Sequence, residues 1–153
     1  MAENTVSATI DQLPDLEGRT FGPSDWREIT QEEVDLYAKV SGDDNPIHID
    51  EEFAASTPFG TRIAHGLLTL SLVVPHMRQI FQITEVGMGI NYGLNKVRFP
   101  APVPVGSRVR VHGSITSVTD IGGGYQVEVP VIFEIEGSEK PACAAELVLR
   151  YYR

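Results

Sequence analysis

The hydrophobic pattern of the chain changes character near Gly87. Before this point, apolar residues recur at helical spacing or form one long run, and after it they alternate with polar residues. The alternation is clearest in residues 108–111 and 126–129. A largely helical first half followed by several strands predicts an α+β domain built on an antiparallel sheet.

The first helix is expected at residues 30–42, after a short strand at 25–30. Thr30 and Glu33 have the spacing of a capping box, and the range ends in a glycine, a typical residue for a helix end. Residues 43–62 contain two prolines and show no clear period. A connection this long in a compact domain is often functional.

The segment AHGLLTLSLVVPHMRQIFQI, beginning at Ala64, is apolar on nearly all sides. A helix of that kind is buried rather than amphipathic, and Pro75 is expected to kink or divide it. Four strands should follow, separated by turn-rich segments; they are expected at 89–99, 107–119, 124–136 and 141–152. So apolar a helix can be buried only if the sheet wraps around it.

Length and composition fit one soluble domain. The chain has 153 residues, and no apolar run reaches the ~18 residues that a membrane span needs. The N-terminus lacks the basic start and apolar centre of a secretion signal. A single cysteine, Cys143, excludes an internal disulfide. We therefore expect a cytoplasmic protein without a membrane partner.

The charge of the chain is negative and unevenly placed. A net charge of −9 makes nucleic acid an improbable partner. Residues 1–60 carry 14 acidic and three basic residues, whereas residues 61–153 carry seven and nine. Four basic residues on strands expected to be adjacent could attract an anionic ligand, or they could be ordinary outward-facing residues. They are Lys96, Arg98, Arg108 and Arg110.

The segment SGDDNPIHID, residues 41–50, carries the most reactive set of side chains. Asp43 and His48 lie five residues apart, and the turn expected around Asn45 and Pro46 can bring them to opposite sides of one water molecule. A carboxylate and an imidazole in that arrangement can take a proton from water and deliver one to carbon. The alternative is that Asp43 only marks the end of a helix. Asp50 is expected to begin a solvated turn.

A metal site is not expected in this sequence. An EF-hand would need a ligand where Ile47 stands and a glycine that is missing. The four histidines show no paired zinc-ligand spacing, and Cys143 stands alone. Gly66, in contrast, lies where the buried helix should begin. Its N–H could stabilise an oxyanion, or the glycine could simply permit tight packing.

Three segments together resemble a known family. YAKVSGDDNPIHIDEEFA, from Tyr37 to Ala54, is similar to the signature of MaoC-like, (R)-specific enoyl-CoA hydratases. AHGLLTLSL resembles the second block of that family, and INYGLNKVRFPAPVPVGSRV, from Ile90, resembles its nodulation-protein-N-like branch. The resemblance spans roughly residues 20 to 152, so we expect an N-terminal arm at 1–18 and a MaoC-like dehydratase domain at 19–153.

The resemblance implies a single hot-dog domain, an antiparallel sheet wrapped around one long helix, that forms a homodimer through sheet edges. It implies reversible hydration of trans-2-enoyl thioesters to (R)-3-hydroxyacyl thioesters in fatty-acid metabolism, on coenzyme A or acyl carrier protein and without a cofactor. It assigns Asp43 and His48 as the acid/base pair, Asn45 as their positioning partner at the substrate, and the Gly66 amide as the oxyanion donor. Two alternatives remain: an acyl-CoA thioesterase on the same fold, and a non-catalytic acyl-binding subunit.

Overall fold

A computed structural model of the chain describes residues 4–153. Its largest element is an antiparallel sheet with strand order β2-β6-β8-β9-β5, in which β3 also pairs with β6 and β7 with β8. The strands are β2 (Thr20–Phe21), β3 (Arg27–Glu28), β5 (Met88–Arg98), β6 (Arg108–Ser114), β7 (Ser117–Asp120), β8 (Gly124–Ile135) and β9 (Cys143–Tyr152). The helices are α1 (Gln31–Ser41), α2 (Pro46–Ile49), α3 (Glu51–Ala55), α4 (Gly66–Ser71) and α5 (Val73–Ile80).

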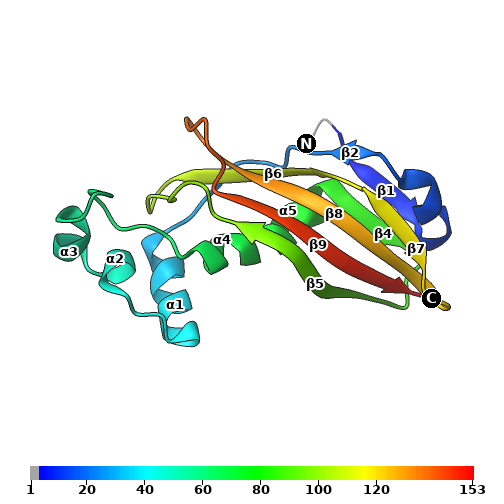
Figure 1. Ribbon diagram of the computed structural model, residues 1–153, viewed down its shortest axis with the longest axis horizontal. Coiled ribbons are helices and arrows are strands. Elements are labelled where there is room, and N and C mark those ends of the chain that lie inside the picture. Colours follow the sequence, from blue (N-terminus) through cyan, green and yellow to red (C-terminus); the bar gives the residue numbers. More distant parts are fainter. Residues whose placement is uncertain (1–3) are drawn as a thin grey trace.

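The sheet curves around α4 and α5, while α1, α2 and α3 lie together at one end of the molecule (Figure 1). This arrangement confirms the hot-dog architecture. No helix within residues 4–153 is long and apolar enough to cross a membrane.

The strand pattern of the sequence is reproduced along the long strands. From Val127 onward every second residue of β8 is buried, with Val127, Val129, Val131 and Phe133 fully inside the core. The expected strand at 107–119 is instead divided into β6 and β7. Their pairing with β8 slips by one residue, because Gly113 faces Val131 whereas Ser117 faces Glu128. Between them, the Ile115 amide points away from β8 and donates to the Arg19 carbonyl at 2.9 Å.

The central helix is divided, as Pro75 led us to expect, although the family resemblance implied one long helix. α4 ends at Ser71 and α5 begins at Val73. Proline has no amide hydrogen, so Pro75 cannot donate to the carbonyl of Ser71, and its ring crowds that turn. The first helix therefore ends at Ser71, four residues before the proline, rather than at the proline itself. One flank of this segment is uncovered, since Leu67 is 59% exposed.

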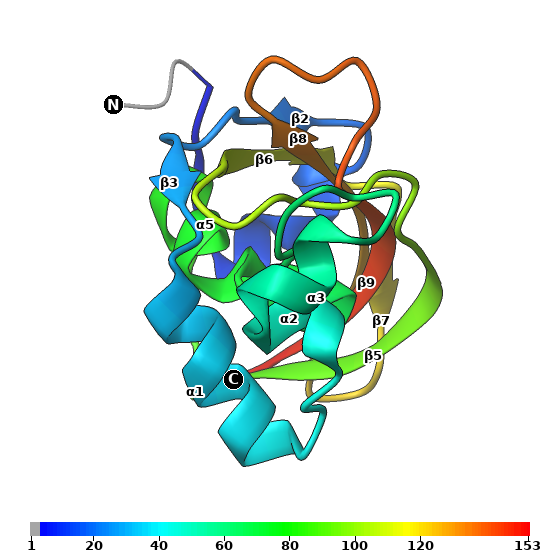
Figure 2. The same ribbon diagram turned by 90° about the vertical axis from the view of Figure 1, so that its left-hand side faces the viewer.

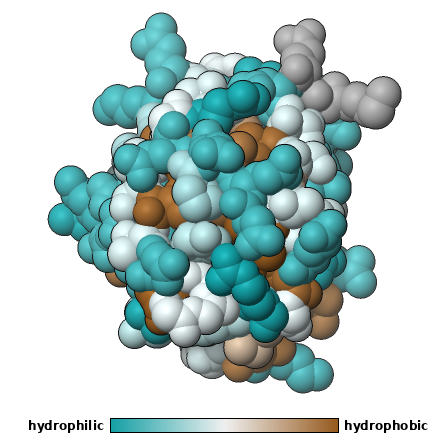
Figure 3. All heavy atoms as spheres, turned by 90° about the vertical axis from the view of Figure 1, so that its right-hand side faces the viewer, coloured by the Kyte–Doolittle hydropathy of each residue, from teal (hydrophilic) through white to brown (hydrophobic). Residues whose placement is uncertain are grey.

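The N-terminal segment forms part of the core. Within the expected arm at 1–18, whose first three residues lie outside the described part, β1 (Val6–Thr9) pairs in parallel with β4 (Phe81–Thr84). A 3₁₀ helix, η1 (Ile10–Leu16), follows, and its Ile10 and Leu13 are buried in the main hydrophobic cluster. Figure 3 shows this end of the molecule, where polar side chains divide the apolar surface into small pieces.

Local sequence signals account for the helices near the other end. Thr30 caps α1 by accepting a hydrogen bond from the Glu33 amide, and Glu33 bonds back to the Thr30 amide, as the capping box predicts. The connection expected to be irregular at 43–62 contains α2 and α3. Both are short, and each is capped by the side chain before it, Asn45 and Asp50 respectively.

A fully buried histidine, His76 of α5, joins the helix to the sheet. Its Nδ1 lies 2.8 Å from the Ser24 hydroxyl, which also accepts a hydrogen bond from the Val111 amide at 2.9 Å. Its Nε2 is buried without a partner in the described part of the chain, and the ring meets Phe133 edge-on. Burial lowers the pKa of His76 to about 4, with a smaller effect from the Arg27 charge. The neutral form is therefore the one that the core accepts.

His76 should make the fold less stable in acid. Its pKa is about 4 in the folded chain and near 6.5 when exposed, so the unfolded chain takes up a proton first as the pH falls. The stability that the neutral ring contributes is complete above pH ~6.5 and declines toward pH ~4, by about 3 kcal/mol in total. Urea unfolding of the wild type and of His76→Gln at several pH values should show their difference in stability narrowing over this range.

His112 provides the control: it lies on the outer face of β6 with 42% of its side chain exposed, 3.4 Å from Glu134, so His112→Gln removes a histidine outside the core. Its unfolding free energy should run parallel to that of the wild type. Parallel curves for His76→Gln would contradict the role assigned to the buried ring.

Candidate active site

The end of α1, the short helix α2 and the start of α4 meet at the end of the molecule that faces the viewer in Figure 2. Gly42 ends α1 in the left-handed conformation, with φ of 78°, and thereby turns the chain toward α2. Asp43 follows directly, and its amide donates to the Ser41 hydroxyl at 3.2 Å. The Asp43 side chain is exposed at this turn.

His48 is fixed by a hydrogen bond to the main chain of another segment. Its Nδ1 lies 2.6 Å from the carbonyl oxygen of Ile63, so Nδ1 carries the hydrogen and Nε2 is left as an acceptor. The ring is buried, with 7% of the residue exposed. Asn45, expected at the substrate, accepts a hydrogen bond from the Ile47 amide at 3.2 Å and starts the helix that carries His48. Its observed contact is thus a helix cap.

Burial lowers the pKa of His48 below its usual value. The hydrogen bond to Ile63 acts in the opposite direction, the neighbouring His65 adds to the lowering, and Asp43 acts against it. The lowered pKa favours a neutral imidazole that can accept a proton at Nε2.

Asp43, His48 and His65 converge in space. A carboxylate oxygen of Asp43 and one ring nitrogen of each histidine lie within 4.8 Å of one another. One water molecule can bridge groups at that separation, as the sequence predicted for Asp43 and His48. Metal binding fits poorly, because the two imidazoles are stacked with centroids 3.8 Å apart and an angle of 29°. Their nitrogen lone pairs lie in nearly parallel planes and do not point at a common ion.

A cavity of about 300 Å³ opens beside His48 and reaches the start of α4. Its lining is mostly apolar and comprises His48, Phe59, Ile63, Ala64, Gly66, Thr69, Phe99, Ala101, Pro102, Val103 and Ala142. Gly66 is the first residue of α4, and a Cβ there would lie 3.0 Å from the Phe99 ring. The packing explanation for this glycine therefore has a structural basis, independent of any role for its N–H.

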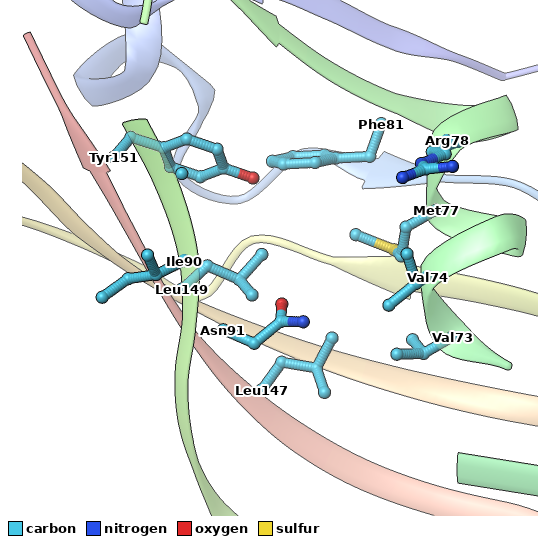
Figure 4. A pocket seen from close by; sticks show the side chains of 11 residues that line it. Val73, Val74, Met77, Arg78, Phe81, Ile90, Asn91, Leu147, Leu149 and Tyr151 are labelled. Atoms are coloured by element: carbon cyan, nitrogen blue, oxygen red, sulfur yellow. The ribbon is translucent and has the colours of Figure 1, made fainter. Parts of the chain in front are cut away.

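A second cavity of about 300 Å³ lies farther along the same layer, between α5 on one side and β5 and β9 on the other. Figure 4 shows Val73, Val74 and Met77 of α5 facing Leu147 and Leu149 of β9 across it. Phe81 and Tyr151 lie side by side at one boundary, and burial raises the pKa of Tyr151 to about 12. This space is suited to an apolar chain.

The four basic residues considered as an anion site do not form one group. β5 carries Lys96 and Arg98, but β8 and β9 lie between β5 and β6, so the expectation of adjacent strands was wrong. Neighbours in sequence are not neighbours in this sheet. Arg108 and Arg110 of β6 are also neutralised by ion pairs with Glu136 and Glu134.

His65 is the functional candidate that the sequence did not single out for chemistry. Its neighbour Gly66 attracted attention because of the helix start, but the stack of His65 on His48 joins residues 17 positions apart. No local period reveals such a contact. Cys143, by contrast, is buried, and burial raises the pKa of its thiol to about 11.

Comparisons with known proteins relate the whole domain to one family. The family model described as "MaoC like domain" matches residues 13–135. The 3-hydroxyacyl-thioester dehydratase Z of Mycobacterium tuberculosis is 52% identical over 147 residues, covering 94% of this chain and 97% of the relative. Nodulation protein N of Rhizobium leguminosarum is 38% identical over 143 residues, covering 92% and 89%. The structure of an (R)-hydratase from A. caviae involved in PHA biosynthesis superimposes with a TM-score of 0.71 at 26% identity, covering 87% and 94%.

The environment of His48 can be tested by NMR titration of its ring, assigned from the spectrum of His48→Gln. The apparent pKa should fall below 6.5, the ordinary value for histidine, because burial disfavours the cation. Asp43→Asn removes a negative charge that acts in the opposite direction, so the pKa should fall further. A rise in the pKa on this substitution would show that Asp43 does not face the ring.

Proposed function

The chain belongs to the MaoC-like domain family, and we propose from that membership that its site catalyses the reversible hydration of trans-2-enoyl thioesters to (R)-3-hydroxyacyl thioesters. One observation carries the proposal. A carboxylate oxygen of Asp43 lies within 4.8 Å of a ring nitrogen of His48, and His48 lines an apolar cavity. The names of the similar dehydratase and (R)-hydratase support the same reaction.

In the hydration direction, water bound between the two side chains loses a proton to His48 Nε2 as its oxygen attacks C3 of the enoyl group. Nε2 is the free acceptor because Nδ1–H is committed to Ile63. Asp43 orients the other hydrogen of the water and stabilises the imidazolium that forms. The same proton then passes from His48 to C2, so that one water supplies both the hydroxyl and the hydrogen to one face. Dehydration is the reverse sequence.

The thioester carbonyl gains negative charge while C3 is attacked. We assign the Gly66 N–H as its hydrogen-bond donor, because Gly66 is the first residue of α4 and lines the same cavity as His48. A donor in such a position elsewhere contributes about 3 kcal/mol to the transition state. The acyl tail then points toward the second cavity, which Val73, Val74 and Met77 line on the next helix.

Removing the carboxylate tests its role in holding the water and stabilising the imidazolium. Asp43→Asn should lower kcat for hydration of crotonyl-CoA by at least about 100-fold and leave KM nearly unchanged, because stabilisation of charge that develops in the transition state is commonly worth that much. The decline in enoyl absorbance measures the rate. Asp44→Asn is the matched control, because Asp44 is an adjacent, exposed aspartate outside the cluster.

A thiol reagent in the same assay separates the alternative reaction, since hydrolysis releases free coenzyme A and hydration does not. Thiol release by the wild type would indicate a thioesterase. Near-normal hydration by Asp43→Asn would remove Asp43 from the mechanism, and an inactive wild type would favour a non-catalytic acyl-binding subunit.

We also propose that two copies associate through β5. This strand ends the sheet, and it exposes a row of large apolar side chains, with Met88, Ile90, Tyr92 and Leu94 all substantially accessible. Leu67 and Val74 extend the apolar surface onto the adjoining helices. An exposed apolar edge strand is a liability unless it is covered, and pairing with the β5 of a second copy would continue the sheet.

Light scattering should give the wild type twice the chain mass of 16.8 kDa. Leu94→Lys places a charge in the proposed contact between the two β5 strands and should shift the protein toward the monomer. Val40→Lys makes the same change on α1, at a residue that is 86% exposed, and should leave the mass unchanged. A wild type of monomer mass would exclude this assembly.

A further inference from the structure

We propose that His65 is a positioning residue that holds both members of the catalytic pair, so that the Asp43 carboxylate and the His48 ring address the same water. The inference rests on the proposed function but concerns a side chain that takes no proton in it. His65 lies immediately before α4 and is buried, with 2% of the residue exposed. It is also the residue before Gly66, so one short segment contacts Asp43 and His48 and carries the proposed oxyanion donor.

The first contact of His65 is with the loop that carries Asp43. Its Nε2 lies 2.9 Å from the main-chain carbonyl oxygen of Asp43, so Nε2 carries the hydrogen and donates it. Asp43 otherwise sits in an exposed turn after α1, tethered through its amide to the Ser41 hydroxyl. The bond from His65 fixes the other side of the same residue. Together the two tethers limit where the carboxylate can reach.

The second contact is with the other catalytic group. The imidazoles of His65 and His48 are stacked, with centroids 3.8 Å apart and an angle of 29°. The stack restrains the tilt of the His48 ring, while the hydrogen bond from Nδ1 to Ile63 restrains its rotation within the plane. Both restraints are needed to direct Nε2 at one point in the cavity. Sites that lose such supporting contacts lose rate through small misplacements.

Packing alone does not account for a histidine at this position. The ring lies against Tyr37, with centroids 4.8 Å apart, and its Nδ1 is buried without a hydrogen-bond partner among residues 4–153. A buried acceptor without a hydrogen-bond partner is unfavourable, and a phenyl ring would fill similar space without one. The imidazole is explained by the N–H that it gives to Asp43. The two functions of the ring, stacking and donation, can therefore be separated by substitution.

Two variants separate them. His65→Phe keeps a flat ring against His48 but removes the donor, whereas His65→Gln keeps an N–H donor and removes the ring. Each should lower kcat on crotonyl-CoA about 10- to 100-fold with KM changed by no more than about twofold, because the pair is misplaced while substrate contacts remain. His112→Gln, at an exposed histidine on β6, should retain the wild-type rate.

A second readout does not depend on activity. In ¹H–¹⁵N spectra of the imidazoles, assigned from His48→Gln, the His48 ring of the wild type should show one tautomer with its hydrogen on Nδ1. In His65→Gln its signals should move and broaden, because the unstacked ring can tilt about its hydrogen bond to Ile63, while thermal melting confirms a folded protein. Unchanged His48 signals together with an unchanged kcat would overturn the proposal, and so would a loss of rate that only follows a loss of folded protein.

The two hypotheses fail differently. If the wild type hydrates no enoyl-CoA but the His48 spectra respond to His65→Gln as described, the proposed function is excluded and the positioning role remains. If the wild type is active but neither His65→Phe nor His65→Gln changes the His48 spectra or kcat, only the positioning role is excluded.

Discussion

The burial of the α4–α5 segment against the concave face of the sheet determines where the other parts of the molecule lie. Leu68, Val73, Met77 and Ile80 meet the inward-facing residues of β6, β8 and β9 in one continuous core. Each such side chain contributes about 1.5–3 kcal/mol when it is fully buried. Because the apolar segment occupies the centre, its polar beginning at His65 emerges at the end of the sheet, where the loop after α1 can reach it.

Two buried imidazoles in this core illustrate how the environment decides the role of a histidine. His76 bonds to Ser24 through one nitrogen and buries the other against apolar groups, so no ligand can approach it. His48 also bonds through one nitrogen, here to Ile63, but it lines a cavity and faces a carboxylate. The first ring stabilises the fold as a neutral group, whereas the same kind of hydrogen bond leaves Nε2 of the second as an acceptor beside the cavity, as the proposed proton transfer requires.

Sequence reasoning reached the parts of this structure that local chemistry determines. The capping box of Thr30 and Glu33, the alternation in β8 and the turn that joins Asp43 to His48 each follow from side chains within a few residues. Long-range contacts were less accessible. The order of β5 and β6 in the sheet depends on which strands return between them, and the stack of His65 on His48 joins the start of α4 to α2. Pro75 predicted a disruption of the helix, but the hydrogen bond that it prevents would have been accepted by the carbonyl of Ser71, four residues earlier.

The proposed reacting groups and the lining of the second cavity come from different residues. The groups proposed to handle the proton and the oxyanion lie between Asp43 and Gly66, whereas every residue that lines the second cavity lies at Val73 or later in the chain. Substitutions that reshape the second cavity therefore leave the reacting groups in place. A protein organised in this way can change the acyl tails that it accepts while its reaction stays the same. Related proteins can therefore share one reaction and differ in their substrates.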